Sequence, residues 1–250
     1  MIRHRFSVFR GVGPKLEQTI WKGGVLDWPG FLKSTRVSGL PAGLYRSVSR
    51  QICQWMNALE RGDAAFFAKN LPLAEHWQLY KVFGESVRYL DIETTGLIRG
   101  YNVVTMVGIY NGQKYQALIR GKGLTNSALQ RALQGCKLIV TYYGRVFDVP
   151  FLRNAYPRVD WNYPHFDLCF AGRRLGFKGG LKGVEKSLGI ERPGEIEHVD
   201  GFEAVRLWYR YTAGSKKALN HLIAYNEADT TNLVRIAPLV YDGLCNKCRP

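Results

Sequence analysis

Hydrophobic positions in this chain change their spacing about a third of the way along. In the first part they recur every three to four residues, as at Val48 and Ile52, which is typical of amphipathic helices. In the second part, short apolar runs bounded by turn residues alternate with helical patterns. We therefore expect a helical module over residues 1–84, an α/β domain over residues 85–242 and a tail over residues 243–250.

The second part begins with three predicted strands, followed by helices that alternate with one further strand. The predicted strands are residues 87–92, 103–110, 114–119 and 138–142. The predicted helices are residues 125–134, 149–156, 181–188 and 205–211, with a long final helix over residues 216–240. Asn111-Gly112 predicts a tight hairpin between the second and third strands. This order indicates a mixed β-sheet flanked by helices.

Near the N-terminus, glycine and proline mark a turn that leads into a helix. Gly11 and Gly13 permit the turn, and Pro14 suits the first turn of a helix that we expect to end at Lys22. Asp27 is placed to cap a second short helix. The segment resembles the helix-hairpin-helix modules of DNA-handling proteins, which implies that Gly11, Gly13 and Lys15 contact a nucleic-acid phosphate. A packing module whose glycines only make the turn is the alternative.

Two carboxylates end the first predicted strand. Side chains alternate along a strand, so Asp91 and Glu93 share one face while Ile92 enters the core. Neighbouring carboxylates repel each other and are best tolerated where a divalent cation neutralises them. A solvated strand end is the alternative, but Asp148 and Asp229 follow in two later segments. These four acids together are a candidate metal site.

The charge of the chain favours a polyanionic partner. The formal net charge is +15, divided into +7 over residues 1–84 and +8 over residues 85–250. A basic field attracts nucleic acid and accelerates its encounter with the protein, although a basic balance also serves solubility. Because both parts of the chain carry this charge, neither is a separate basic tail.

Cysteine usage and hydropathy favour a soluble, cytoplasmic protein. Five scattered cysteines do not form a disulfide framework, and the N-terminus lacks the apolar stretch of a signal peptide. Cys245 and Cys248 have the spacing of half a zinc site, but no second pair of ligands lies nearby. No apolar run reaches the roughly 18 residues of a membrane span.

The four acids and the predicted topology resemble the ribonuclease-H-like DEDD exonuclease superfamily over residues 86–240. The stretch from Gly180 to Ile190 is most similar to YprB-type ribonuclease-H-like domains. Tyr225 lies four residues before Asp229, as in the tyrosine subtype, and on a helix this spacing places both side chains on one face.

The resemblance implies a metal-dependent 3′–5′ exonuclease that acts on single-stranded or frayed ends. It implies two Mg²⁺ or Mn²⁺ ions, with Asp91 bridging them, Glu93 and Asp229 on the first, and Asp148 acting indirectly. Two such metals suit phosphodiester cleavage. Tyr225 would orient the attacking water, since the ordinary pKa of tyrosine, about 10, favours hydrogen bonding over proton abstraction.

The resemblance also implies contacts to the substrate. Thr94, Thr95 and Leu97 would lie against the terminal nucleotide, although Leu97 could instead be a core residue. Tyr143 stands where the tyrosine subtype often has asparagine, so the contact to the substrate end is expected to differ. A basic run that could follow a phosphate backbone, or simply form a solvated helix face, contains Arg173, Arg174, Lys178, Lys182 and Lys186.

Two alternatives to an exonuclease stay open at this point. A structure-dependent endonuclease could use the same metal site, because the acids specify cleavage and not the path of the strand. A non-catalytic nucleic-acid-binding scaffold could recruit a helicase or polymerase through its helical N-terminal part. The complete set of acids favours catalysis, and no sequence element distinguishes a DNA substrate from an RNA substrate.

Overall fold

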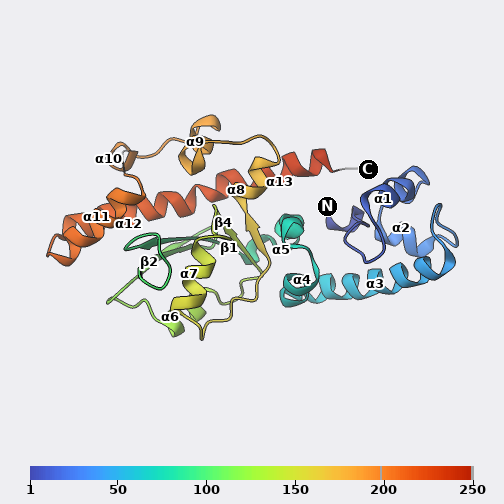
Figure 1. Cartoon of the computed structure of the whole chain (residues 1–250), viewed down its shortest axis with the longest axis horizontal. Coiled ribbons are helices and arrows are strands. Elements are labelled where there is room, and N and C mark those ends of the chain that lie inside the picture. The colour runs from blue at the N-terminus through green and yellow to red at the C-terminus, as the bar shows by residue number, and fades with distance from the viewer. Residues whose placement is uncertain (198, 249–250) are drawn as a thin grey trace.

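A five-stranded mixed sheet forms the centre of the molecule, described by a computed structural model over residues 1–197 and 199–248 (Figure 1). The strands are β1 (Val87–Thr94), β2 (Val104–Tyr110), β3 (Tyr115–Ile119), β4 (Leu138–Thr141) and β5 (His165–Asp167). Their order in the sheet is β3-β2-β1-β4-β5, with antiparallel pairing among the first three and parallel pairing from β1 to β4 and β5. The α/β prediction is confirmed. β5 was not predicted, because three residues are too few to display a period.

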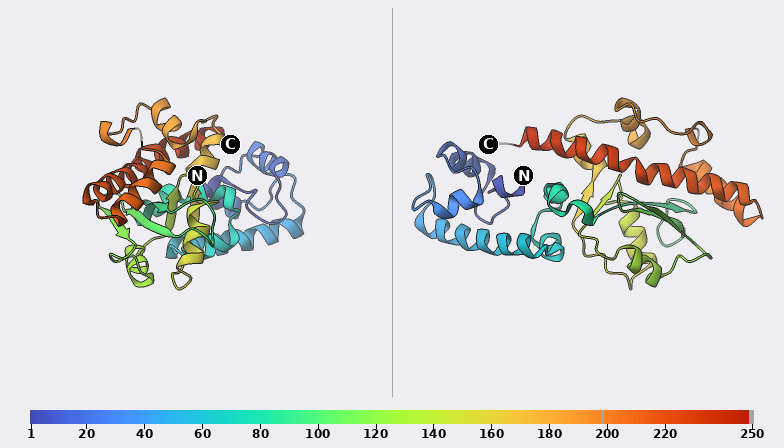
Figure 2. Two further views of the ribbon diagram at one scale, coloured as in Figure 1. Left: turned by 60° about the vertical axis from the view of Figure 1, so that its left-hand side comes forward. Right: turned by 180° about the vertical axis from the view of Figure 1, so that it is seen from behind.

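Helices cover both faces of the sheet (Figures 1 and 2). The helices of this part are α6 (Asn126–Ala132), α7 (Asp148–Ala155), α8 (Leu168–Arg173), α9 (Gly180–Ser187), α10 (Gly194–Glu197), α11 (Gly201–Thr212), α12 (Lys216–Thr231) and α13 (Leu233–Lys247). α6 and α7 lie on one face, and α11, α12 and α13 run along the other. The fold thus consists of a helix layer, a sheet and a second helix layer.

The alternation of side chains along β1 is the one that its sequence predicts. Leu90 and Ile92 are buried in the apolar cluster that includes Leu129 of α6 and Phe151 of α7. Asp91 and Glu93 therefore point to the opposite face, where α12 packs on β1. This arrangement places the acidic end of β1 beneath α12.

The C-terminal helical region differs from the single helix predicted over residues 216–240. α12 ends at Thr231, and α13 begins at Leu233 and continues to Lys247. Leu244 and Cys245 are buried in the core, which explains why the helix persists beyond Val240 into the expected tail. Residues 249–250 of that expected tail lie outside the described residues.

Helices form the N-terminal region, as predicted. They are η1 (Ile2–His4), α1 (Pro14–Lys22), α2 (Trp28–Lys33), α3 (Ala42–Arg61), α4 (Ala64–Asn70), η2 (Leu73–Leu79), α5 (Tyr80–Phe83) and η3 (Gly84–Ser86), where η marks a 3₁₀ helix. The Asp27 carboxylate caps α2 by accepting the N–H of Gly30. Only the short η1 precedes the turn at Gly11, so assignment to the helix-hairpin-helix class stays a prediction.

The N-terminal helices and the sheet share a continuous apolar core. Trp28 and Trp55 belong to the same buried cluster as Val87 of β1 and Tyr241 of α13. Trp77 contacts Tyr241 edge to face, at 5.7 Å between ring centroids. A domain boundary between residues 84 and 85 stays a prediction, because packing is continuous across it.

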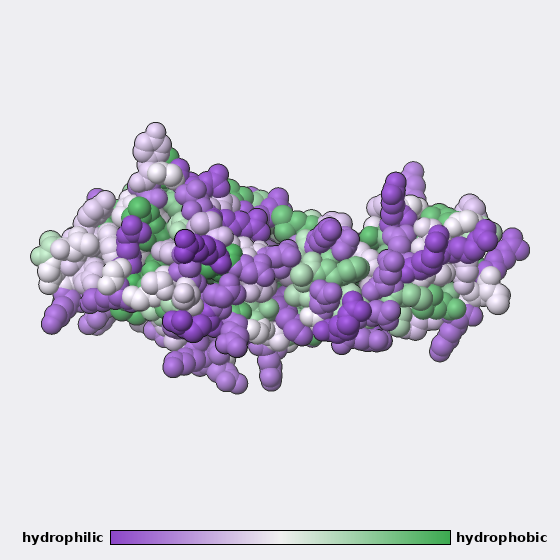
Figure 3. Space-filling view, turned by 90° about the horizontal axis from the view of Figure 1, so that it is seen from below, coloured by the Kyte–Doolittle hydropathy of each residue, from purple (hydrophilic) through white to green (hydrophobic). Residues whose placement is uncertain are grey.

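Hydrophilic side chains dominate the side of the molecule drawn in Figure 3, over both its thicker sheet-containing end and its narrower N-terminal end. Across residues 1–197 and 199–248, no helix combines the length and the apolar character needed to cross a bilayer.

Candidate active site

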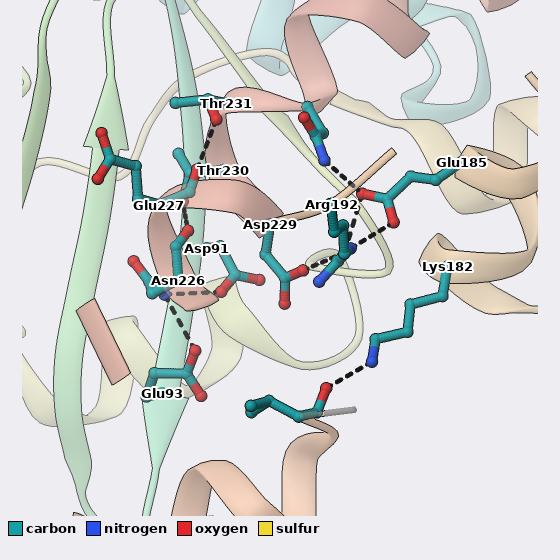
Figure 4. A network of polar contacts seen from close by, with 12 residues as sticks. Asp91, Glu93, Lys182, Glu185, Arg192, Asn226, Glu227, Asp229, Thr230 and Thr231 are labelled. Atoms are coloured by element: carbon teal, nitrogen blue, oxygen red, sulfur yellow. Dashed lines mark hydrogen bonds and ion pairs between the residues drawn. The ribbon is translucent and has the colours of Figure 1, made fainter. Parts of the chain in front are cut away.

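Three carboxylates converge between the sheet and α12. Asp91 and Glu93 extend from β1 and Asp229 from α12, and one potential ligand atom of each lies within 4.8 Å of the others (Figure 4). Asp148, at the start of α7, lies beside them, and its Oδ1 accepts the N–H of Ile92 at 3.1 Å. The structure thus brings the four sequence-predicted acids into one region, with Asp148 outside the group of three.

Burial and mutual repulsion disfavour the charged forms of these acids. Burial raises the pKa of Asp91 well above its ordinary value, and the neighbouring Asp148, Asp229 and Glu93 raise it further. The pKa of Glu93 is likewise raised, by burial and by Asp229. Burial raises the pKa of Asp148 to about 7. A positive charge placed among these groups would therefore be strongly attracted.

A buried amide orients the two acids of β1. Asn226 of α12 donates one Nδ2 hydrogen bond to Asp91 Oδ2 at 2.8 Å and another to Glu93 Oε1 at 3.2 Å. Its own Oδ1 accepts a hydrogen bond from the Tyr115 hydroxyl at 2.8 Å. A Cβ at Gly108, the residue paired with Asp91 in β2, would lie 1.9 Å from Asn226 Oδ1. Glycine at that position gives the amide room to reach the acids.

Arg192 holds the third acid from the other side. Its guanidinium forms an ion pair with Asp229 and also donates to both oxygens of Glu185, at 2.6 and 2.8 Å (Figure 4). The Arg192 and Glu185 side chains are only 6% and 2% exposed. Burial raises the pKa of Asp229, and Arg192 opposes that rise. Arg192 thus supplies a fixed positive charge at the edge of the acidic group.

Tyr225 lies one helical turn from Asp229 on α12, as its spacing predicts. Its pKa is raised by burial and by the carboxylates of Asp229 and Glu93. The Arg192 guanidinium carbon lies 5.7 Å from the centre of its ring. A phenol in this setting retains its proton near neutral pH and acts as a hydrogen-bond donor.

These residues open into a cavity of about 470 Å³. Its walls come from the end of β1, the β4–α7 loop, the start of α11 and one face of α12. Leu97 and Phe202 contribute to the wall and are 72% and 73% exposed. The cavity therefore combines an acidic floor with exposed apolar side chains.

The predicted substrate contacts fall into two groups. Thr94, Leu97 and Tyr143 line the cavity, so core burial of Leu97 is excluded. Thr95 instead stabilises the loop after β1, because its hydroxyl accepts the backbone N–H of Val103 at 3.0 Å. Tyr143 adopts a φ of 67°, a conformation uncommon for residues other than glycine.

Asp167 fixes the unusual loop that contains Tyr143. Its carboxylate accepts the N–H of Tyr143 at 3.0 Å and the N–H of Arg145 at 2.9 Å. The Tyr143 ring then stacks on Phe170, with ring centroids 5.8 Å apart. Asp167 therefore positions one wall of the cavity without lining it.

The predicted basic contacts do not line the cavity. Lys182 of α9 reaches toward the acids, and its Nζ donates to Val199 O at 2.5 Å (Figure 4). Lys178 precedes α9, so the expectation that it shares one helix face with Lys182 is wrong; Gly179 and Gly180 turn the chain between them. Gly11 lies in the turn three residues before α1, Gly13 is the residue just before the helix, and Lys15 is in its first turn.

Sequence reasoning missed several residues of the site. Asn226 carried a usable signal, because it lies three residues before Asp229 on one helix and therefore shares its face. Arg192 carried none, since it lies in irregular chain whose path no period predicts. Phe202 lies in the first turn of α11, which begins four residues before the helix predicted from Val205. Asp167 ends the strand that was too short to predict.

The donor set fits hard divalent cations. Mg²⁺ and Mn²⁺ prefer carboxylate oxygens, and Asp91, Glu93 and Asp229 offer them at close range. Over the described residues, the only hydrogen-bond donor shared by Asp91 and Glu93 is the Asn226 amide. One neutral amide does not compensate two neighbouring carboxylates, of which Glu93 is buried and Asp91 half-buried, so their charge is left for a cation to neutralise.

Comparison with known proteins agrees with this architecture. No curated protein matches the chain. A solved structure described as "apo form of the nuclease" is 20% identical, with a TM-score of 0.50, over 70% of this chain and 78% of that one. Brucella melitensis NrnC with bound Mg²⁺ is 19% identical, with a TM-score of 0.49, over 66% and 76% of the two chains. The model of the RNase H superfamily matches residues 88–241, more than half of the chain, and the protein therefore belongs to that superfamily.

Proposed function

We propose that this protein is a metal-dependent nuclease that removes nucleotides from the 3′ end of single-stranded or frayed nucleic acid. The observation that carries the proposal is the convergence of Asp91, Glu93 and Asp229 on the floor of an open cavity. Exposed apolar side chains in the same wall offer surfaces on which a base can stack. Membership of the RNase H superfamily makes this chemistry the first to test.

Asp91, Glu93 and Asp229 are the residues that would hold divalent cations, with Asp148 beside them. Such cations supply an activated water and neutralise charge on the phosphate. By the resemblance stated above, two ions would serve this purpose, with ligands from Asp91, Glu93 and Asp229. Asn226 holds Asp91 and Glu93 in a fixed orientation, which lowers the cost of arranging them for binding.

The remaining residues of the site have roles suited to a phosphodiester substrate. Tyr225 keeps its proton and donates a hydrogen bond that orients the attacking water. Arg192 restrains Asp229, leaving its carboxylate in a defined position. Leu97 and Phe202, both exposed in the cavity wall, contact the base of the terminal nucleotide.

The polarity of the reaction and the domain organisation are further parts of this proposal. The tyrosine subtype, to which Tyr225 and Asp229 assign the chain by resemblance, acts from the 3′ end. Residues 1–84 form a basic helical module that accompanies the RNase-H-like domain of residues 85–242 and adds affinity for nucleic acid, with net charge +7.

A time course on 5′-labelled single-stranded DNA and RNA with Mn²⁺ tests the function. We expect stepwise shortening of the labelled strand, which stops in the Asp91→Ala variant and after chelation. A single internal cut would instead identify an endonuclease. Intact strands of both kinds, with binding retained, would refute catalysis and identify a binding scaffold.

A further inference from the structure

A second cavity, of about 380 Å³, lies beside the candidate active site and is lined by three arginines. These are Arg99, Arg145 and Arg153, and we call this cavity the arginine groove. Among the described residues that line it, none is an aspartate or glutamate. All three arginines are exposed, so the groove presents positive charge to solvent with no carboxylate in its lining, and such a surface attracts anions.

The three guanidinium groups are not neutralised by the surrounding protein. Within residues 1–197 and 199–248, none of them forms an ion pair with a carboxylate. Arg153 donates to Trp161 O at 3.1 Å, and Arg145 lies 4.6 Å from the centre of the Phe170 ring. The nearby Asp167 is already engaged by four backbone N–H groups, which satisfy its charge locally.

Two short loops connect the groove to the active-site cavity. Arg99 is two residues after Leu97, and Arg145 is two residues after Tyr143. Leu97 and Tyr143 line the active-site cavity, while the two arginines line the groove. A strand with its end against the acids would have to pass one of these loops to reach the groove.

An aromatic pair lies beside Arg145 and includes Tyr143 of the active-site cavity. Tyr143 stacks on Phe170 with an interplanar angle of 20°, and Tyr143 is 42% exposed. The guanidinium groups of Arg145 and Arg173 lie over the Phe170 ring, at 4.6 and 5.5 Å from its centre. Aromatic rings interleaved with arginines are the usual platform for single-stranded nucleic acid, because bases stack while the cations bind phosphates.

We propose that the arginine groove binds the phosphate backbone of the substrate strand, upstream of the nucleotide held at the acids. This inference rests on the proposed function, because the strand bound in the groove is the one whose 3′ end enters the active site. The proposal requires a substrate strand long enough to span both cavities. In that complex, Arg99 and Arg145 contact phosphates of the strand.

Binding in a catalytically disabled protein tests the groove separately from hydrolysis. In an Asp91→Asn background, Kd would be measured by fluorescence anisotropy for single strands of roughly 12 and roughly 3 nucleotides across a salt series. Adding Arg99→Gln and Arg145→Gln should weaken binding of the longer strand about tenfold. It should also reduce the slope of log K against log salt by about 1.4, or about 0.7 for each phosphate contact.

Two controls make the outcome specific. Lys216→Gln with Lys217→Gln removes the same charge from exposed positions at the start of α12 and should leave both affinities unchanged. Arg99→Lys with Arg145→Lys should retain most of the affinity.

Equal loss for both strands, or no loss for the longer one, would overturn the groove proposal while leaving the nuclease proposal intact. Absence of cleavage by the wild type with length-dependent binding retained would overturn only the nuclease proposal.

Discussion

Arg192 forms a buried ion pair with Asp229, and the same guanidinium donates two hydrogen bonds to Glu185. Glu185 also accepts a hydrogen bond from Asn232 at 2.9 Å. One acid of the candidate metal site is thus tied through arginine to a second buried acid on α9. The loop before α10 is thereby fastened to α12, the helix that also carries Tyr225.

Removing Arg192 should destabilise the fold strongly. Arg192→Ala leaves Glu185 and Asp229 buried without their cation, which costs about 3–5 kcal/mol of unfolding free energy in the absence of divalent metal. Urea denaturation followed by circular dichroism measures this. Arg206→Ala is the matched control, because it breaks an exposed pair with Glu203 and should cost less than about 1 kcal/mol. Equal losses in the two variants would contradict the structural role of Arg192.

Asn226 should control affinity for divalent cations. Asn226→Ala removes the amide that orients Asp91 and Glu93, so Mn²⁺ affinity should fall about 10- to 100-fold. Isothermal titration calorimetry with Mn²⁺ measures the change. Asn232→Ala removes a neighbouring amide that bonds Glu185 instead, and it should leave Mn²⁺ affinity nearly unchanged. An unchanged affinity in Asn226→Ala would show that the amide does not organise the site.

The exposed apolar wall of the cavity should determine substrate affinity. Phe202→Ala removes a stacking contact to a base worth about 1–3 kcal/mol, and Leu97→Ala removes an apolar contact to the same nucleotide. We expect KM to rise about tenfold or more with kcat changed less, measured in steady-state hydrolysis of a short single strand. Leu239→Ala, which truncates an exposed leucine of α13, provides the control. A fall in kcat without a change in KM would argue against base contacts by these residues.

His76 should make stability depend on pH. Its Nδ1 accepts the N–H of His165 at 2.9 Å, so Nε2 carries the proton shared with Leu71 O. Burial lowers the pKa of His76 to about 4, from an unfolded value of about 6.5. Between about pH 6.5 and about pH 4, His76 binds a proton in the unfolded chain but stays neutral in the folded protein. Stability from this group is therefore present above about pH 6.5 and is lost as the pH falls toward 4.

Comparison with His76→Gln isolates this effect. The variant lacks the titrating group, so the stability advantage of the wild type should shrink by about 2 kcal/mol between about pH 7.5 and about pH 5. Urea unfolding at both pH values provides the measurement. Burial also lowers the pKa of His165, to about 3, and His76 lowers it further. The part due to burial is common to both proteins. Parallel stability profiles would rule out a buried neutral His76.

Local sequence patterns predicted most of the elements. The alternation around Ile92 predicted β1 and the common face of Asp91 and Glu93, and the Asn111-Gly112 turn predicted the β2–β3 hairpin. These features depend on residues that are adjacent in sequence, so local patterns are enough to predict them. The final helix was wrong in its bounds because burial of Leu244 and Cys245, a long-range effect, extends it.

Spacing within one element predicted part of the candidate site, and the resemblance to a known superfamily joined acids that lie on β1, α7 and α12. Tyr225 and Asp229 lie one turn apart on a helix, so their proximity followed from spacing. Arg192 contacts Asp229 across a sequence separation of 37. The contact depends on the path of irregular chain, which local propensity does not specify.

The most direct test of the central claim is the release of the 3′-terminal nucleotide in a single turnover. Wild-type protein in excess over a 3′-labelled single strand would be mixed with Mn²⁺, beside Asp91→Asn, with the products resolved by size. Metal-dependent release of a labelled mononucleotide, abolished by the substitution and unaffected in Lys216→Gln, is the predicted result. Release that persists in Asp91→Asn, or a labelled product longer than one nucleotide, would contradict the assignment of these acids to 3′-terminal hydrolysis.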